Sequence, residues 1–303
     1  MSTTELLSTL QFSGVSAIFA LAIYASLWTG VLSVAPVFFG AIGAFAFGYL
    51  STTAGLTPAL GLLVGIVLGA VAGVVTAVLF VRLNSHYLAM ATIALVLISR
   101  VLIINLPVKV AGGVTGTLLP ADLGRWSWLI GCLVLAGYVM ARLARSRFGF
   151  AADAVREDPA VAQSLGISPR QIQIVGFILS GALGGMAGVM QGSFLQFIGP
   201  DTFYTDLGFV SLAAVVLGGA FNWLGPIVGA VVFTILPVLL RDPLGAYNQI
   251  VTGVILVAII IYLPRGLVDV RWVRLLRDRA RRGSRPTRPQ TDVEAASTHA
   301  GAV

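Results

Sequence analysis

Charged residues are scarce in this sequence. Only 10% of its 303 residues are Asp, Glu, Lys or Arg, whereas 57% are hydrophobic. Soluble domains carry about 25% charged residues, and so few charges do not cover a surface exposed to water. Lipid must therefore surround most of the chain, and the composition predicts an integral membrane protein.

Residues that build catalytic and metal sites are also few. The only lysine, Lys109, lies in LPVKVAGG, which excludes the Gly-Lys-Ser/Thr end of a phosphate-binding P-loop. The two histidines, His86 and His299, offer no paired metal ligands, and Cys132 alone excludes a disulfide within the chain. Nothing in the sequence brings the partners of a Ser-His-Asp or Cys-His site together. We therefore expect no catalytic residue, no metal site and no cofactor on this chain.

Carboxylates are missing from the long apolar runs. This argues against an ion- or proton-coupled transporter, because such transporters use buried carboxylates. The one ionisable residue in the middle of a run is Arg100, in LVLISRVLIIN. Its side chain either contacts a carboxylate or serves a gate, or else it faces the helix bundle or reaches outward to the interface. The sequence alone favours the second pair of interpretations.

Positive charge gathers after the last apolar run. The formal net charge is +7, and nine of the 19 basic residues lie between Arg265 and Arg288. A basic run just beyond a membrane span sets topology or contacts anionic lipid more often than it binds nucleic acid. We therefore expect lipid contact and no nucleic-acid partner. Residues 266–303 are interpreted as a basic, disordered cytoplasmic tail, because the end of the chain lacks an apolar period.

Apolar runs long enough to cross about 30 Å of hydrocarbon recur along the chain. They lie near residues 13–32, 34–51, 57–81, 86–106, 126–144, 172–198, 207–222, 224–240 and 247–263. The run 34–51 is either a span or a re-entrant segment, and the glycines and Pro226 within 207–240 indicate two short or broken helices. Residues 1–265 are thus predicted to form an all-α, polytopic transmembrane bundle of eight or nine spans.

Arginine placement predicts the orientation. The arginines that we assign to the cytoplasmic side are Arg82, Arg142, Arg145, Arg147, Arg156, Arg170 and Arg265. The opposite loops hold only Lys109, Arg125 and Arg241, against four aspartates, and cytoplasmic loops are the ones rich in Arg and Lys. This predicts a multi-pass protein of the inner or plasma membrane with a cytoplasmic C-terminus. The N-terminus is external with nine crossings and cytoplasmic if residues 34–51 are re-entrant.

Small residues recur at every fourth position in two runs. One series is Gly61, Gly65, Gly69 and Gly73, and the other is Gly176, Ser180, Gly184, Gly188 and Gly192. A four-residue step keeps these residues on one helix face, where they let two backbones approach closely. We interpret both series as faces for helix packing, without a further function.

A polar loop, residues 145–171, separates two apolar runs and is too long for a simple turn. Its sequence predicts a short helix over 151–165 that restarts at Pro159, with Asp158 as N-cap and Gly166 as the C-terminal stop. Val155, Ala162 and Leu165 are expected to share one face. The segment is either a docking helix for a cytoplasmic partner or a solvated connector, and both alternatives stay open from the residues alone.

The run AADAVREDPAVAQSLGI within this loop closely resembles the cytoplasmic loop of ABC-transporter permeases of the branched-chain amino acid type, M-like subunit. In that family the loop inserts into a groove on the ATPase subunit. The resemblance implies an ATPase-coupling role for Arg156, Glu157, Asp158, Ala160, Val161, Ala162 and Gly166. Val161 stands where the family usually has Ala.

Four further segments resemble the same family in the same order. SVAPVFFGAIGAF keeps Ser33, Phe39 and Gly43, although it has Ala35 and Pro36 where Gly and His are common. RLNSHYLAMATIA, from residue 82, keeps a Tyr and a Thr in register. AGGVTG, residues 111–116, and VLGGAFNWLGPIVGA, residues 216–230, match two glycine-rich segments, the second with Phe where Gly is usual.

The resemblance implies a permease of an ATP-driven importer that moves branched-chain or other hydrophobic amino acids by alternating access. It implies a sister permease as heterodimer partner, two ATPases that bind ATP and Mg²⁺, and an extracytoplasmic solute-binding protein. Another small solute, such as urea, an amide or a sugar, is the alternative, ahead of an ion-coupled transporter and a membrane-embedded enzyme or scaffold. Candidate residues of the translocation pathway are Ser33, Phe39, Gly43, Tyr87, Thr92 and Arg100.

Overall fold

The computed structural model describes residues 3–240, apart from 56, 81, 84, 107–115, 120–122 and 124, and then 251, 253, 254, 261 and 266–268. Most of the predicted last span, 247–263, and most of the predicted tail lie outside the described residues. Residues 111–115 of the AGGVTG segment, Lys109, Arg241 and Arg265 also lie outside them. The disorder expected of the tail therefore stays a prediction.

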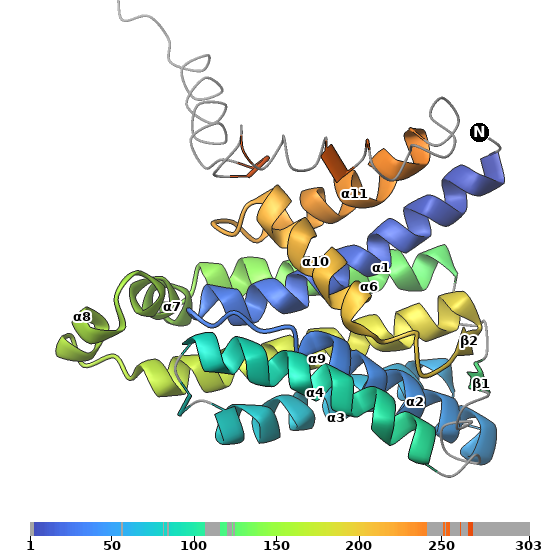
Figure 1. Cartoon of the computed structure of the whole chain (residues 1–303), viewed down its shortest axis with the longest axis horizontal. Helices are drawn as coiled ribbons and strands as arrows, with labels where there is room; N and C mark the ends of the chain where they lie inside the picture. Colours follow the sequence, from blue (N-terminus) through green and yellow to red (C-terminus); the bar gives the residue numbers. More distant parts are fainter. Residues whose placement is uncertain are drawn as a thin grey trace, which may run out of the picture. The chain divides into compact units, whose positions relative to one another are not determined.

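Six described helices are long and apolar enough to cross a membrane. They are α1 (Thr3–Trp28), α2 (Pro36–Ala54), α3 (Pro58–Phe80), α4 (Ser85–Asn105), α6 (Trp126–Ala144) and α9 (Pro169–Leu195). The other helices are the apolar α10 (Thr205–Gly218) and α11 (Leu224–Leu239) and the short, more polar α7 (Arg147–Glu157) and α8 (Pro159–Ser164). The strands β1 (Thr117–Leu118) and β2 (Phe197–Ile198) pair antiparallel. The prediction of an all-α polytopic bundle is confirmed (Figure 1).

Helix α9 lies at the centre of the bundle and packs against α1, α2 and α3. Its contact with α3 is made through glycines: a Cβ added at Gly69 would overlap the carbonyl oxygen of Gly181, and one added at Gly65 or Gly73 would meet Val189 or the carbonyl of Phe177. Without side chains between them the two backbones touch, which is the usual way that membrane helices gain packing energy.

A second glycine row of α9 faces α2. A Cβ at Gly184 would meet Pro36, one at Gly188 would overlap the carbonyl of Gly40, and Gly192 lies against Leu119 and Ala44. In α3, Gly61 instead lies under the ring of Phe47 of α2. The row that includes Gly181 and Gly185 escaped the sequence analysis, although its four-residue step is the same.

The helices define two ends of the bundle, here named the α7–α8 end and the β1–β2 end (Figure 1). The order of the α3–α9 contacts shows that these helices run antiparallel, so the connection from α3 to α4 lies beside the start of α9. Leu267 donates a backbone hydrogen bond to Leu217 of α10, which brings residues 266–268 to the α7–α8 end as well. The arginines assigned to one side of the membrane therefore gather at one end: Arg82, Arg142, Arg145, Arg147, Arg156 and Arg170.

The first predicted span, 13–32, was wrong at both ends, because helix α1 begins at Thr3 within a less apolar stretch. Helix α1 stops at Trp28, and residues 31–34 are not helical. Gly176 of α9 lies against Thr29, whereas Gly184 lies against Pro36. Eight helical residues rise about 12 Å, so the chain travels that far back along the bundle before α2 begins. The predicted interruption of 207–240 is confirmed, because α10 ends at Gly218 and α11 starts at Leu224.

Candidate functional site

The non-helical segment 31–34 lies inside the bundle, where its backbone needs hydrogen-bond partners other than water. Side chains supply two of them. The Val34 amide donates to the Thr92 Oγ1 at 3.3 Å, and the Ala35 amide donates to the Ser33 Oγ at 3.2 Å. Pro36 follows as the first residue of α2 and has no amide to satisfy. Thr92 of α4 therefore stabilises the point where the path between α1 and α2 is irregular.

Helix α10 meets the same segment from another direction. A Cβ added at Gly208, in the first turn of α10, would overlap the side chain of Val34. Helix α10 is short, and the loop 199–204 precedes it. The beginnings of α2 and α10 thus face each other across residue 34. Irregular backbone at membrane depth, between interrupted helices, is a common setting for a transport site.

The predicted pathway residues lie in different surroundings. Ser33 and Thr92 are fully buried around the irregular segment, and Phe39 is fully buried in a cluster with Ala35 and Phe177. Gly43 packs against the backbone of Gly185, so it lies at a helix contact. Tyr87 is 65% exposed near the start of α4, at the α7–α8 end and apart from the others. The structure brings together Ser33 and Thr92, and their part in transport stays a prediction.

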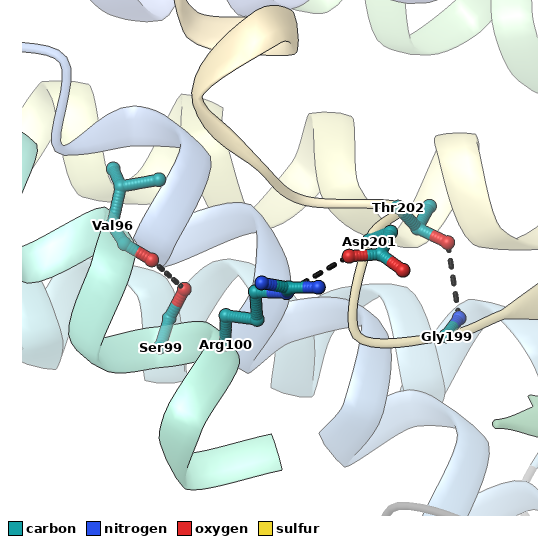
Figure 2. Close-up of polar contacts among 6 residues, drawn as sticks. All are labelled: Val96, Ser99, Arg100, Gly199, Asp201 and Thr202. Carbon is teal, nitrogen blue, oxygen red and sulfur yellow. Dashed lines mark hydrogen bonds and ion pairs between the residues drawn. The ribbon is translucent and has the colours of Figure 1, made fainter. Parts of the chain in front are cut away.

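Arg100 contacts a carboxylate, which is the interpretation that the sequence favoured less (Figure 2). Its Nε lies 2.8 Å from the Asp201 Oδ1, and its guanidinium lies over the ring of Tyr204, 5.1 Å from the centroid. Asp201 and Tyr204 come from the loop before α10. No local pattern connects residues 101 positions apart, so the sequence analysis missed this pair.

A small apolar cavity opens between α2 and α4. Its volume is about 110 Å³. It is lined by Phe38, Ala41, Ile42, Phe45, Ser99, Leu102, Ile103 and Leu106. The hydroxyl of Ser99 donates to the carbonyl of Val96 at 2.6 Å, as Figure 2 shows, so the one polar lining side chain is already engaged. The cavity therefore offers an apolar lining.

The loop 145–171 folds into α7 and α8 at one end of the bundle. Asp158 caps α8 by accepting hydrogen bonds from the amides of Ala160 at 2.8 Å and Val161 at 3.2 Å, and Pro159 begins the helix. Gly166 has a φ of +81°, the left-handed conformation that glycine adopts after a helix. The predicted cap, restart and stop are confirmed.

The two helices present apolar side chains outward. Phe150 is 71% exposed, Val161 55% and Leu165 71%, whereas Val155 and Ala162 are buried. The expectation that Leu165 shares a face with Val155 and Ala162 was wrong, because the kink at Asp158 separates α7 from α8 and α8 ends at Ser164. Exposed apolar side chains on an otherwise polar loop are typical of a surface that contacts another protein or the membrane.

Arg156 turns inward instead of joining that surface. Its Nη1 donates to the carbonyl of Ala220 at 2.6 Å, and its guanidinium lies 4.7 Å from the ring centroid of Phe221. One turn earlier on the same face of α7, Asp153 accepts a hydrogen bond at its Oδ1 from the Trp28 Nε1 at 2.7 Å. Helix α7 is therefore bonded both to the end of α1 and to the turn between α10 and α11. Glu157 and Asp158, in contrast, are exposed.

Within the described part of the chain, no group of three His, Cys, Asp or Glu side chains is placed to hold an ion. The features that stand out are thus the irregular segment, the Arg100–Asp201 pair beside the cavity, and the α7–α8 surface.

Comparison with known proteins decides the family. Residues 6–260 match the family described as the permease component of the branched-chain amino acid transport system. The chain belongs to this family. The resemblance drawn from its segments is thereby confirmed, and the family is one of transport permeases, not enzymes.

Individual relatives agree with this permease assignment. The chain is 30% identical over 272 residues to the high-affinity branched-chain amino acid transport system permease protein LivM of Escherichia coli K12, covering 77% of this chain and 62% of that protein. It is 32% identical over 154 residues to the probable LivH permease of Methanocaldococcus jannaschii, covering 48% of each. It is 31% identical over 144 residues to the autoinducer 2 import system permease LsrC of E. coli O157:H7, covering 45% of this chain and 41% of that one. The chain thus spans about three fifths of the LivM length. No solved structure matches it.

Proposed function

We propose that this permease is the membrane-spanning subunit of an ATP-driven importer for branched-chain or other hydrophobic amino acids. A sister permease forms a heterodimer with it, two separate ATPases bind ATP and Mg²⁺, and a solute-binding protein delivers the solute at the opposite face. The observation that carries the proposal is the outward apolar surface of α7 and α8, formed by Phe150, Val161 and Leu165. In the family that this loop resembles, the loop inserts into a groove on the ATPase subunit, and the chain has no P-loop of its own.

The contacts of α7 support a route for the force. When an ATPase moves α7, the Trp28–Asp153 hydrogen bond carries the displacement to the end of α1, and Arg156 carries it to the turn after α10. Helix α1 continues directly into the segment 31–34, and Gly208 of α10 lies against the same segment. A small shift at α7 therefore acts on both sides of the irregular point, where a packed interface switches between two arrangements.

The α7–α8 end faces the cytoplasm in this proposal, together with the C-terminus, in the inner or plasma membrane. The arginines gathered at that end support it, since cytoplasmic loops carry the excess of Arg and Lys. The β1–β2 end then faces the solute-binding protein.

The apolar lining of the cavity supports an aliphatic solute. The alternative solute is urea, another amide or a sugar. The match to LsrC supports retaining this alternative, because the name of that relative states that its system imports autoinducer 2. Uptake assays with labelled leucine, urea and ribose in one reconstituted transporter distinguish the solutes.

The coupling role is tested by Gly166→Val. A branched side chain fits poorly at φ +81°, so the bonds that close α8, from the Gly166 amide to Gln163 and from the Ile167 amide to Ala162, are weakened. In proteoliposomes that hold the whole transporter, we expect ATP hydrolysis to continue while leucine uptake falls about ten-fold. Gly131→Val, on a face of α6 with open space, is the control. Unchanged uptake in Gly166→Val would count against the coupling role.

A further inference from the structure

We propose that Arg100, Asp201 and the cavity between α2 and α4 form a binding site for one amino-acid zwitterion. The solute's carboxylate binds the guanidinium of Arg100, its ammonium binds the carboxylate of Asp201, and its aliphatic side chain enters the cavity. This site rests on the proposed function, in that it takes the transported solute to be an amino acid. Figure 2 shows Arg100 and Asp201 pointing toward each other from α4 and from the loop before α10.

The charged pair lies beside the cavity. Ser99 and Ile103, which line the cavity, flank Arg100 on α4 by one and three residues. On the other wall, the ring of Phe45 lies 6.4 Å from the ring of Phe203, edge to face. Phe203 belongs to the same loop as Asp201. Both charges therefore lie next to an apolar space. A hydrophobic amino acid carries the complementary groups, which are a carboxylate, an ammonium and an apolar side chain.

The pair is weakly held and can exchange partners. The Arg100 side chain is 43% exposed and the Asp201 side chain 75%, and ion pairs with such exposure contribute little to stability. The contact joins only the Arg100 Nε to one oxygen of Asp201, at 2.8 Å. A guanidinium carries five N–H donors and binds a carboxylate well, because planar carboxylates match its geometry.

The size of the cavity selects the side chain. A cavity of about 150 Å³ holds benzene, so about 110 Å³ accommodates an isopropyl or isobutyl group. Polar side chains would lose hydrogen bonds to water in an apolar lining. Leucine, isoleucine and valine are therefore the preferred solutes, with alanine weaker because it fills less of the cavity.

The roles of the two charges are tested by measuring the uptake of radiolabelled leucine. The complete transporter, which includes the sister permease, the ATPases and the binding protein, is reconstituted in proteoliposomes for this assay. Arg100→Gln and Asp201→Asn are each expected to lower uptake about ten-fold or more, as for the loss of one charge-assisted hydrogen bond. Arg125→Gln removes the same charge at the first residue before α6, which lies at the same end of the bundle, and is expected to leave uptake within about two-fold of the wild type.

The double exchange Arg100→Asp with Asp201→Arg separates binding from structure. It restores an ion pair between the loop and α4, yet the bound zwitterion must then turn its carboxylate and ammonium around, which points its side chain away from the cavity. We expect uptake to stay about ten-fold low. Recovery of uptake in the exchanged protein, or single variants that transport like the wild type, would overturn the site. A wild-type transporter that moves urea or ribose but no amino acid would overturn the proposed solute and this site together.

The cavity is tested by Ala41→Leu, which fills it from the α2 side. We expect leucine uptake to fall while alanine uptake persists, so that the preference for leucine over alanine drops about ten-fold. Val134→Leu enlarges an exposed side chain of α6 and serves as the control. An unchanged preference in Ala41→Leu would mean that a lipid chain or the sister permease fills the cavity, and would contradict the proposal even if Arg100→Gln failed to fold.

Discussion

At the scale of single residues, local chemistry was predictable and distant pairing was not. The cap at Asp158 and the stop at Gly166 follow from neighbours within eight residues, and both are found. Arg156 was grouped with Glu157 and Asp158 as one coupling triplet, but its guanidinium binds the carbonyl of Ala220, 64 residues away. A sequence does not show which side of a short helix a long side chain takes.

Phe221 stands where the family that this segment resembles usually has Gly, and it contacts Arg156. Its ring lies under the guanidinium of Arg156, and such an exposed cation–π contact is worth about 0.5–1 kcal/mol. We predict that Phe221→Leu, which keeps bulk but removes the ring, lowers leucine uptake per ATP hydrolysed about two- to five-fold. Phe221→Tyr keeps the contact and is expected to behave like the wild type. Equal coupling in the two variants would show that only the bulk of residue 221 matters.

At the scale of elements, hydropathy located the described helices to within a few residues, except where α1 begins and ends. Apolar composition continues from α1 through residues 31–34 into α2, so nothing in hydropathy marks the break. The physical cause is tertiary: the hydroxyl of Thr92, 58 residues away from Val34, supplies the hydrogen bond that a helix would otherwise provide. The existence of the spans was therefore predictable, and the irregular segment between two of them was not.

Packing of α3 on α9 is predicted to fail when a side chain enters the contact. Gly69→Val places its Cβ against the backbone carbonyl of Gly181, which cannot move without shifting the whole helix. We expect a loss of about 1–3 kcal/mol or more, visible as a lower temperature of unfolding for the detergent-purified protein. Val71→Leu adds a methylene on the exposed face of α3 and is expected to change nothing. Equal unfolding temperatures for the two variants would mean that the helices separate easily.

At the scale of the whole molecule, the distribution of arginines predicts orientation but not assembly. We predict that Glu157→Cys and Asp201→Cys, each made on Cys132→Ala, react with a membrane-impermeant maleimide from opposite sides. Both positions are exposed, and they belong to opposite ends of the bundle. The residue at 157 should be labelled only in inverted vesicles and the residue at 201 only in intact cells. Labelling of residue 157 in intact cells would reverse the proposed topology.

The identity of the partner proteins does not follow from the sequence and structure of this one chain. The side chains of Phe150, Val161 and Leu165 are exposed. That another protein covers them, and which protein it is, follows from family membership and remains part of the proposal. The sequence cannot form a P-loop, because its only lysine is Lys109 in LPVKVAGG, and we propose that uphill transport requires force from a second protein. That requirement is the central claim.

ATP-driven leucine uptake against a gradient, in proteoliposomes with the whole transporter, tests this claim most directly when Leu165→Asp is compared with Gln171→Asp. Both variants add one negative charge at exposed positions of the α7–α8 end, but only the first lies on the apolar surface. Leu165→Asp is predicted to release the ATPase on purification and to abolish accumulation, while Gln171→Asp accumulates leucine normally. Accumulation by Leu165→Asp at the wild-type level, or by the permease alone, would contradict the account.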